Sequence, residues 1–183
     1  LSVYLGGTLF EAFIIRGMFK EYKDLNRKWN LDMCEVSDGS IKISHQEKCN
    51  YIKELAKEFR VVSEVGSKDE TKLIAPYRWI ELMQKELEAG AWKVIAEARE
   101  GGNVGIYNKS GDVRSDLIDE ILTKISNDDI VWEAPKKPQQ VWFIKQLGTN
   151  VNLGNIAWDE VIPLETLRIG LRGDTFFDYI NQK

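Results

Sequence analysis

The sequence predicts an α/β fold of repeated βα units. Four strand-like segments each carry a glutamate two residues before the strand is expected to end, at Glu35, Glu64, Glu97 and Glu133. Successive glutamates are 29, 33 and 36 residues apart, about the length of one strand, one helix and two loops. Parallel strands with this spacing would bring all four carboxylates to one end of the sheet.

Alternation of side chains gives each predicted strand two different faces. Glu35 shares a face with Met33, and Glu64 with Val62, whereas the opposite face is mostly apolar, as at Cys34. The apolar face suits a covering layer of helices, so the glutamates are expected to point away from the helices. The alternative is that each glutamate lies in solvent at a frayed strand end, but four matched positions favour a shared site.

Six strands are expected from short apolar or β-branched runs bounded by turn residues. They cover residues 2–7, 32–37, 60–65, 93–99, 129–134 and 150–155. The second ends at Asp38-Gly39-Ser40, which is typical of a turn. The fourth leads into a glycine-rich loop at residues 100–105, which we expect to be flexible and able to close over a ligand.

Helices are expected between these strands. Ser44 and Glu47 form a capping box, Pro135 begins a helix after the fifth strand, and Gly90 ends a helix. The expected helices cover residues 8–29, 76–89, 112–126 and 163–171, in addition to those that begin at Ser44 and Pro135.

Six βα units are fewer than a closed parallel barrel needs. Such a barrel has eight units and typically ~250 residues, and its interior opens to substrate at the carboxyl ends of the strands. An open doubly wound sheet is the alternative, but it would leave the apolar first strand at an edge. The predicted fold is therefore a single domain over residues 1–183, a (β/α)8 TIM barrel with about six units present and two N-terminal units missing.

Composition narrows the class of partner. The 183 residues are 43% hydrophobic and 30% charged, with a net charge of -4 and no basic run. Nucleic acid and membrane surfaces are therefore not expected as partners. The expected partners are small molecules. Cys34 and Cys49 lack metal-ligand spacing, so we expect reduced cysteines and a cytoplasmic protein. A homo-oligomer is compatible with the sequence, which does not fix the oligomeric state.

Several motifs follow one another in a specific order: Gly6-Gly7-Thr8-Leu9-Phe10-Glu11, Glu35-Val36-Ser37-Asp38-Gly39-Ser40, Ser63-Glu64-Val65-Gly66-Ser67-Lys68, Glu97-Ala98-Arg99-Glu100, Glu133-Ala134-Pro135 and Asn150-Val151-Asn152-Leu153-Gly154-Asn155. In these motifs the chain resembles the phosphosulfolactate synthase family over essentially its whole length. The resemblance implies a TIM barrel and a lyase that makes the precursor of coenzyme M. One departure is Gly101, where many members carry serine.

The implied reaction is a magnesium-dependent addition of sulfite to carbon 3 of phosphoenolpyruvate. Protonation of carbon 2 then gives (2R)-2-phospho-3-sulfolactate. Mg²⁺ usually takes only one or two protein carboxylates, so we expect two of Glu35, Glu64 and Glu97 to hold it. The resemblance implies Lys68 as the proton donor to carbon 2, and Glu64 is placed with it in the catalytic set.

Substrate contacts are expected at the same carboxyl ends of the strands. Arg99 has a planar guanidinium suited to binding a carboxylate or sulfonate, although a structural ion pair with Glu97 or Glu100 is the alternative. Phosphate is expected near the end of the sixth strand, as in many barrels. The full predicted set is Arg99, Gly6, Gly7, Thr8, Glu133, Asn152, Gly154 and Asn155.

Two other functions stay open at this point. The first is a non-catalytic, stress-associated barrel relative that acts through protein interaction. The second is another phosphoenolpyruvate or enolate enzyme on the same barrel, such as an aldolase. The retained Glu35, Glu64, Lys68 and Glu97 favour the synthase over the non-catalytic relative, which loss of Mg²⁺ binding would favour. Dependence of the reaction on sulfite separates the synthase from the other enolate enzyme.

Overall fold

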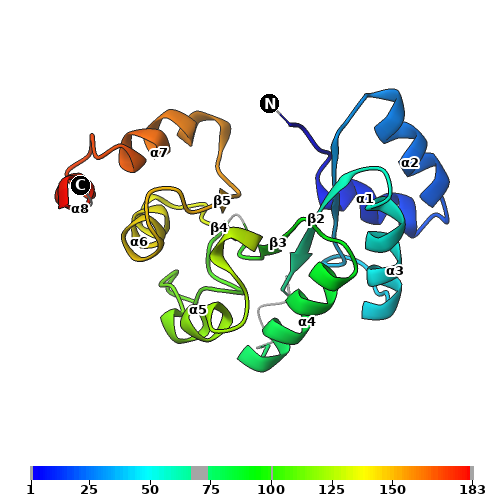
Figure 1. Ribbon diagram of the computed structural model, residues 1–183, viewed down its shortest axis with the longest axis horizontal. Helices are drawn as coiled ribbons and strands as arrows, with labels where there is room; N and C mark the ends of the chain where they lie inside the picture. Colours follow the sequence, from blue (N-terminus) through cyan, green and yellow to red (C-terminus); the bar gives the residue numbers. More distant parts are fainter. Residues whose placement is uncertain (1, 67–73, 100, 182–183) are drawn as a thin grey trace.

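The computed structural model describes residues 2–66, 74–99 and 101–181. At its centre is a five-stranded sheet whose strands are neighbours in chain order (Figure 1). Every neighbouring pair is parallel, so the carboxyl ends of the strands meet at one edge. The strands are β1 (Met33–Val36), β2 (Arg60–Val65), β3 (Lys93–Ala96), β4 (Ile130–Glu133) and β5 (Leu153–Gly154).

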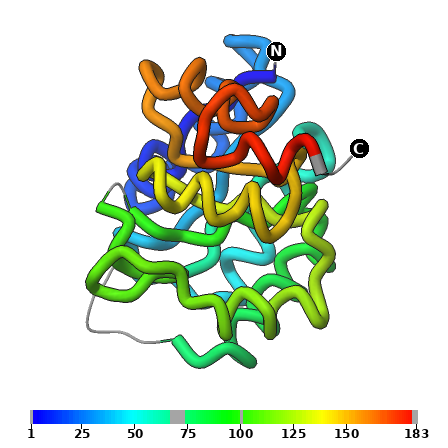
Figure 2. The backbone as a smooth tube through the Cα atoms, turned by 90° about the vertical axis from the view of Figure 1, so that its left-hand side faces the viewer, coloured from blue at the N-terminus to red at the C-terminus, as the bar shows by residue number. Residues whose placement is uncertain are grey.

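Helices precede, connect and follow the strands. In Figure 1 the connecting helices α3, α4, α5 and α6 form an arc around the strands, and in Figure 2 α5, α6 and α7 are stacked in chain order. The helices are α1 (Gly7–Ile14), α2 (Phe19–Lys28), α3 (His45–Leu55), α4 (Pro76–Glu88), α5 (Ser115–Leu122), α6 (Lys137–Leu147), α7 (Val161–Arg168) and α8 (Phe176–Asn181). Short 3-10 turns, η1 (Asn127–Asp129) and η2 (Trp158–Glu160), precede β4 and α7.

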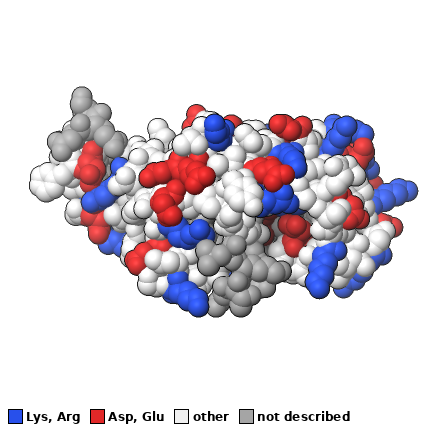
Figure 3. All heavy atoms as spheres, turned by 90° about the horizontal axis from the view of Figure 1, so that it is seen from below, with Lys and Arg blue, Asp and Glu red and all other residues white. Residues whose placement is uncertain are grey.

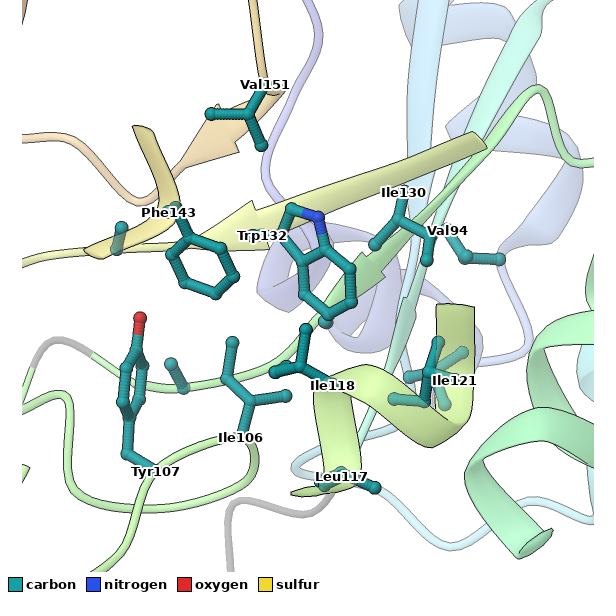
Figure 4. Close-up of a cluster of buried hydrophobic side chains, with 14 of the residues drawn as sticks. Val94, Ile106, Tyr107, Leu117, Ile118, Ile121, Ile130, Trp132, Phe143 and Val151 are labelled. Carbon is teal, nitrogen blue, oxygen red and sulfur yellow. The ribbon is translucent and has the colours of Figure 1, made fainter. Parts of the chain in front are cut away.

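The helix-facing side of the sheet holds the larger hydrophobic clusters. Figure 4 shows one of them, in which Trp132 of β4 lies between Phe143 of α6 and Ile118 of α5. The rings of Trp132 and Phe143 stack with centroids 5.3 Å apart. A second cluster joins Phe10 of α1 and Ile52 of α3 to the start of the sheet. This packing anchors each connecting helix to the apolar face that its strands present.

The opposite face of the sheet has its own small cluster, made of strand residues alone. Met33, Val62, Ile95 and Val131 come from four successive strands. Helices therefore cover one face, as the alternation of residues predicts. A parallel sheet in chain order with helices on one face is compatible with part of a TIM-like barrel.

The expected first strand does not form. Residues 2–6 carry no regular structure, and β1 pairs only with β2 among the described residues. The Ser2 hydroxyl donates to Asp32 at 2.7 Å, and the Gly7 N–H donates to a carboxylate rather than to a ladder carbonyl. Five strands, not six, are therefore described.

The single helix expected over residues 8–29 is also wrong. Gly17 has a φ of 68°, a left-handed conformation that glycine adopts without steric cost, and it ends the first helix. The Met18 N–H turns back to the Phe13 carbonyl at 2.9 Å, which satisfies the end of α1 before α2 begins.

The loop after β3 is packed rather than flexible in its described part. Val104, Ile106 and Tyr107 are buried, and the Gln139 side chain of α6 donates to the carbonyls of Gly102 and Gly111 at 2.9 and 3.1 Å. A loop held by these contacts is not the free lid expected from its glycines.

The predicted capping box is confirmed. The Ser44 hydroxyl accepts from the Glu47 N–H, and the Glu47 side chain accepts from the Ser44 N–H, so the capping box that begins α3 is complete. On the face drawn in Figure 3, acidic and basic side chains are intermixed. Among the described residues, no helix has both the length and the apolar character required to span a membrane.

Candidate active site

The four glutamates of the sequence pattern gather at the carboxyl end of the sheet. Glu35, Glu64 and Glu97 are buried, and Glu133 is half-buried. All four line one pocket of about 430 Å³. Its other lining residues come from the N-terminal segment, the strand ends and the loops that follow them: Tyr4, Gly6, Ile95, Arg99, Val131, Gly154 and Asn155. The glutamates are therefore not solvated at frayed strand ends.

Three of these carboxylates are close enough to share a cation. One oxygen from each of Glu64, Glu97 and Glu133 lies within 4.8 Å of the others. The parallel register explains this proximity, because Glu64 pairs with Ile95 and the next residues of β3 bring Glu97 alongside it. The Glu97 N–H also donates to the Val65 carbonyl at 3.0 Å, which extends the ladder past the end of β3.

Glu133 joins the ends of three strands. Its carboxylate accepts from the Ala98 N–H at 2.7 Å and from the Asn155 side-chain amide at 3.4 Å. Burial raises the pKa of Glu133 to about 7, and the negative charges of Glu64 and Glu35 add to the increase despite the hydrogen bond from Ala98. The site therefore disfavours a further negative charge in the absence of a cation.

Glu97 and Arg99 are fixed by the turn that follows β3. The Glu97 carboxylate accepts from the Arg99 N–H at 2.7 Å, and Arg99 has a φ of 57°. The left-handed backbone at Arg99 turns the chain, and the exposed side chain lines the pocket. The turn thus places Arg99 in the pocket lining together with the four glutamates.

Glu35 has a different local partner. Its carboxylate accepts from the Gly7 N–H at 2.9 Å, at the first residue of α1. A side chain at Gly7 would collide with Glu35 and Ser37, so the close approach needs glycine. Glu35 lines the pocket but stands outside the group formed by Glu64, Glu97 and Glu133.

Comparison with known proteins identifies the family. The model of the (2R)-phospho-3-sulfolactate synthase (ComA) family matches residues 1–174. The chain belongs to the phosphosulfolactate synthase family. This result confirms the resemblance found in the sequence motifs.

Three relatives, each named phosphosulfolactate synthase, match nearly the whole chain. The protein of Bacillus subtilis (strain 168) is 42% identical over 97% of this chain and 71% of its own length. The protein of Methanothermobacter thermautotrophicus is 44% identical over 94% of this chain and 68% of its own length. The protein of Methanocaldococcus jannaschii is 45% identical over 96% of this chain and 72% of its own length.

The structure brings only some of the predicted substrate residues of this synthase family member to the pocket. Arg99, Glu133, Gly6, Gly154 and Asn155 line it. Among the other predicted residues, Gly7 is buried and uses its N–H for Glu35, and the side chain of Thr8 is exposed outside the pocket lining.

Asn152 lies away from the carboxylates. Its side-chain amide donates to the Ile130 carbonyl at 3.1 Å, at the amino end of β4. The phosphate contact expected from Asn152 is therefore not brought to the pocket in this structure. Lys68, the predicted proton donor, lies outside the described residues.

Tyr4 is a pocket residue that the sequence did not single out. Burial raises its pKa to about 12, with further contributions from the charges of Glu35 and Glu133. Tyr4 is two residues from Gly6, so the alternation used for the glutamates would have placed it on the same side of an extended segment. The sequence signal was present but weak, because it rests on a single aromatic residue.

Proposed function

We propose that this chain adds sulfite to phosphoenolpyruvate to give (2R)-2-phospho-3-sulfolactate, with Mg²⁺ as the cofactor. The observation that carries the proposal is the group of Glu64, Glu97 and Glu133 at the rim of the pocket, in a member of the phosphosulfolactate synthase family. The reaction class would be that of a carbon–sulfur lyase.

The donor set fits Mg²⁺. This ion prefers hard oxygen ligands and accepts one or two protein carboxylates together with waters and substrate oxygens. Among the described residues, the pocket lining carries four carboxylates and one guanidinium. Such a lining would repel two anionic substrates. One pair of like unit charges 4 Å apart repels by about 4 kcal/mol at an effective dielectric near 20. Bound Mg²⁺ would supply the positive charge that stabilises a developing negative charge on the substrate carboxylate.

The bond changes balance without an oxidant or a reductant. The lone pair on the sulfur of sulfite forms a bond to carbon 3 of phosphoenolpyruvate, and the electron pair of the carbon–carbon double bond moves toward carbon 2. A proton then adds to carbon 2. The family resemblance assigns that proton to Lys68.

Described residues supply binding and orientation. Arg99 presents a planar fork at the pocket that can bind a carboxylate or sulfonate in a bidentate manner. Asn155 stands beside Glu133 and can donate to a substrate oxygen when the carboxylate is engaged elsewhere. Because metal ligands bind deprotonated, cation binding would favour the ionised form of Glu133.

Phosphorus NMR tests the proposal. Purified protein is mixed with phosphoenolpyruvate, sulfite and Mg²⁺, and each component is omitted in turn. A Lys68→Ala variant tests the proton donor, and Lys109→Ala, which removes an exposed loop lysine, is the matched control. We expect a new phosphoester signal that needs sulfite, Mg²⁺ and Lys68 but not Lys109.

Two results would redirect the assignment. Phosphoenolpyruvate left unchanged by folded protein would favour a non-catalytic relative. Consumption of phosphoenolpyruvate that does not depend on sulfite would favour another enolate enzyme.

A further inference from the structure

Lys48 is a buried lysine that packs directly behind the carboxylate group. It lies on α3, and its side chain is 2% exposed. Its ammonium contacts the carboxylates of Asp38 and Glu86, each at 3.0 Å, and donates to the backbone carbonyl of Glu64. Three acceptors thus match the three N–H groups of the ammonium.

Glu86 completes the cluster from α4. Its side chain is 1% exposed, accepts from the Ser63 hydroxyl at 2.6 Å and lies 3.1 Å from the ring of His45. Burial alone would lower the pKa of Lys48, but the charges of Glu86 and Asp38 outweigh burial and raise it. Burial likewise opposes ionisation of Glu86, yet Lys48, His45 and Ser63 hold its pKa below the usual range. The geometry and these shifts agree on an ionised pair.

The place of this cluster in the fold links it to the pocket. Ser63 and Glu64 are consecutive in β2, so their side chains point to opposite faces of the sheet. The Lys48 cluster holds the helix-facing side, and the Glu64 carboxylate lies on the pocket side. Lys48 also binds Asp38, in the loop after β1, so one ammonium ties together the carboxyl ends of two neighbouring strands.

A buried ion pair contributes little net stability to a core, because its formation carries a large desolvation penalty. Apolar residues of similar volume often stabilise a fold as well or better, because charges must be stripped of water. The ammonium here makes a bond that an apolar side chain cannot, to the backbone of a residue in the carboxylate group. That bond restrains the Glu64 backbone from which the carboxylate projects.

We propose that Lys48 is a positioning residue, which holds the Glu64 carboxylate in register with Glu97 and Glu133. The effect of Lys48 on turnover rests on the proposed function. Its effect on the position of Glu64 does not. Nothing in the sequence motifs singles out Lys48 or Glu86, which are brought together by the packing of α3 on α4.

The test compares two variants of this cluster with one control variant. Lys48→Met leaves Glu86 as an uncompensated buried charge and can unfold the chain, so Lys48→Met is combined with Glu86→Gln. Lys48→Arg keeps the charge and the donors. Lys53→Met, an exposed lysine on the same helix, is the matched control. Cooperative thermal unfolding verifies that each variant is folded.

Three measurements are made on each folded protein. The first is Mg²⁺ affinity by calorimetry without substrate, and the second is kcat against KM for sulfite addition. The third is the NMR shift of the Val65 amide nitrogen and of the Glu64 carboxyl carbon. The Val65 amide shares its peptide group with the Glu64 carbonyl, so its shift reports the bond from Lys48 directly.

The expected result is a folded double variant with Mg²⁺ affinity reduced by about 10–100-fold, the usual cost of losing a residue that orients a metal ligand. The kcat should fall more than KM rises, both NMR signals should move, and Lys48→Arg should recover most of the affinity. Wild-type affinity and unmoved signals in the folded double variant would overturn the proposal.

Failure of the proposed function gives a different pattern. If the wild-type protein binds Mg²⁺ but makes no product, the affinity comparison still decides the role of Lys48. If the wild-type protein binds no Mg²⁺, the proposed function fails and the two NMR signals decide. In that case unmoved signals overturn the positioning role, and moved signals with Lys48→Arg rescue support it.

Discussion

The carboxylate of Glu133 accepts a hydrogen bond from the backbone N–H of Ala98, 2.7 Å away, so the last residue of β4 holds the chain that leaves β3. The same carboxylate is crowded by the charges of Glu64 and Glu35, and burial with these charges raises its pKa to about 7. Glu133 therefore stabilises the local backbone through its hydrogen bond, whereas its negative charge, when ionised, destabilises the folded state. This combination makes the stability of the fold depend on pH.

Glu133→Gln should stabilise the protein in the absence of divalent cations. The folded pKa of Glu133 lies above its ordinary value of 4.5, so its contribution to stability is complete below pH 4.5 and is lost as pH rises through about 7. Glutamine keeps an acceptor for Ala98 and carries no charge. We expect the free energy of unfolding to increase by about 3 kcal/mol at pH 8 and by under about 1 kcal/mol at pH 5.

Urea unfolding in EDTA at both pH values measures this effect. Glu120→Gln, at an exposed position on α5, is the control and should change stability little at either pH. An equal gain for Glu133→Gln at pH 5 and pH 8, or a loss at pH 8, would contradict the assigned pKa.

The arrangement of the glutamates could be predicted because it follows from two local rules. Spacing by one βα unit fixes parallel strands, and alternation fixes the face. Both rules depend on short-range sequence alone, so Glu64, Glu97 and Glu133 come together as expected. The family could be recognised from motifs for a related reason, since the motifs are contiguous in sequence.

The features that sequence could not provide depend on long-range contacts. Lys48 and Glu86 are 38 positions apart in the sequence, on two different helices. The residues next to each of them in the sequence form no motif that would indicate the pairing. The loop after β3 reads as flexible from its glycines, yet Gln139 of α6 binds its carbonyls. The expected first strand has the right composition, but no ladder partner is described for it.

The carboxylates that the structure brings together differ from the set expected to hold Mg²⁺, with Glu133 in place of Glu35. We expect Glu64→Gln, Glu97→Gln and Glu133→Gln each to weaken Mg²⁺ binding by at least about tenfold, because each removes either a direct oxygen ligand or a negative charge beside the ion. Glu35→Gln should have a much smaller effect, since Glu35 lies outside the group of three carboxylates that are within 4.8 Å of one another. Isothermal calorimetry on the substrate-free protein makes the comparison. A loss at Glu35 as large as that at Glu97 would favour the set Glu35, Glu64 and Glu97.

Gln139→Ala should release the loop after β3. The substitution removes two donors to the carbonyls of Gly102 and Gly111, and leaving such groups without their partners costs about 1–3 kcal/mol. Hydrogen exchange of the amides in residues 101–111 should accelerate, while the amides of α6 beyond its first turn should not. Gln146→Ala, at an exposed position on the same helix, is the control. Unchanged exchange in the loop would show that its packing does not depend on Gln139.

Gly105→Ala tests how closely that loop must approach β3. Gly105 has a φ of 64°, and a Cβ there would collide with the backbone carbonyl of Glu97. Backbone strain and the collision together should cost about 2–6 kcal/mol. Gly148→Ala is the matched control, because Gly148 also has a positive φ, 94°, but has no atom near the added Cβ. It should cost only the strain, about 1–3 kcal/mol.

Chemical unfolding compares the stabilities of the two variants. Mg²⁺ affinity should fall for Gly105→Ala alone, because only that change displaces the backbone of Glu97. Equal losses of stability with unchanged affinity would mean that the loop can move away from β3 without disturbing the carboxylate group.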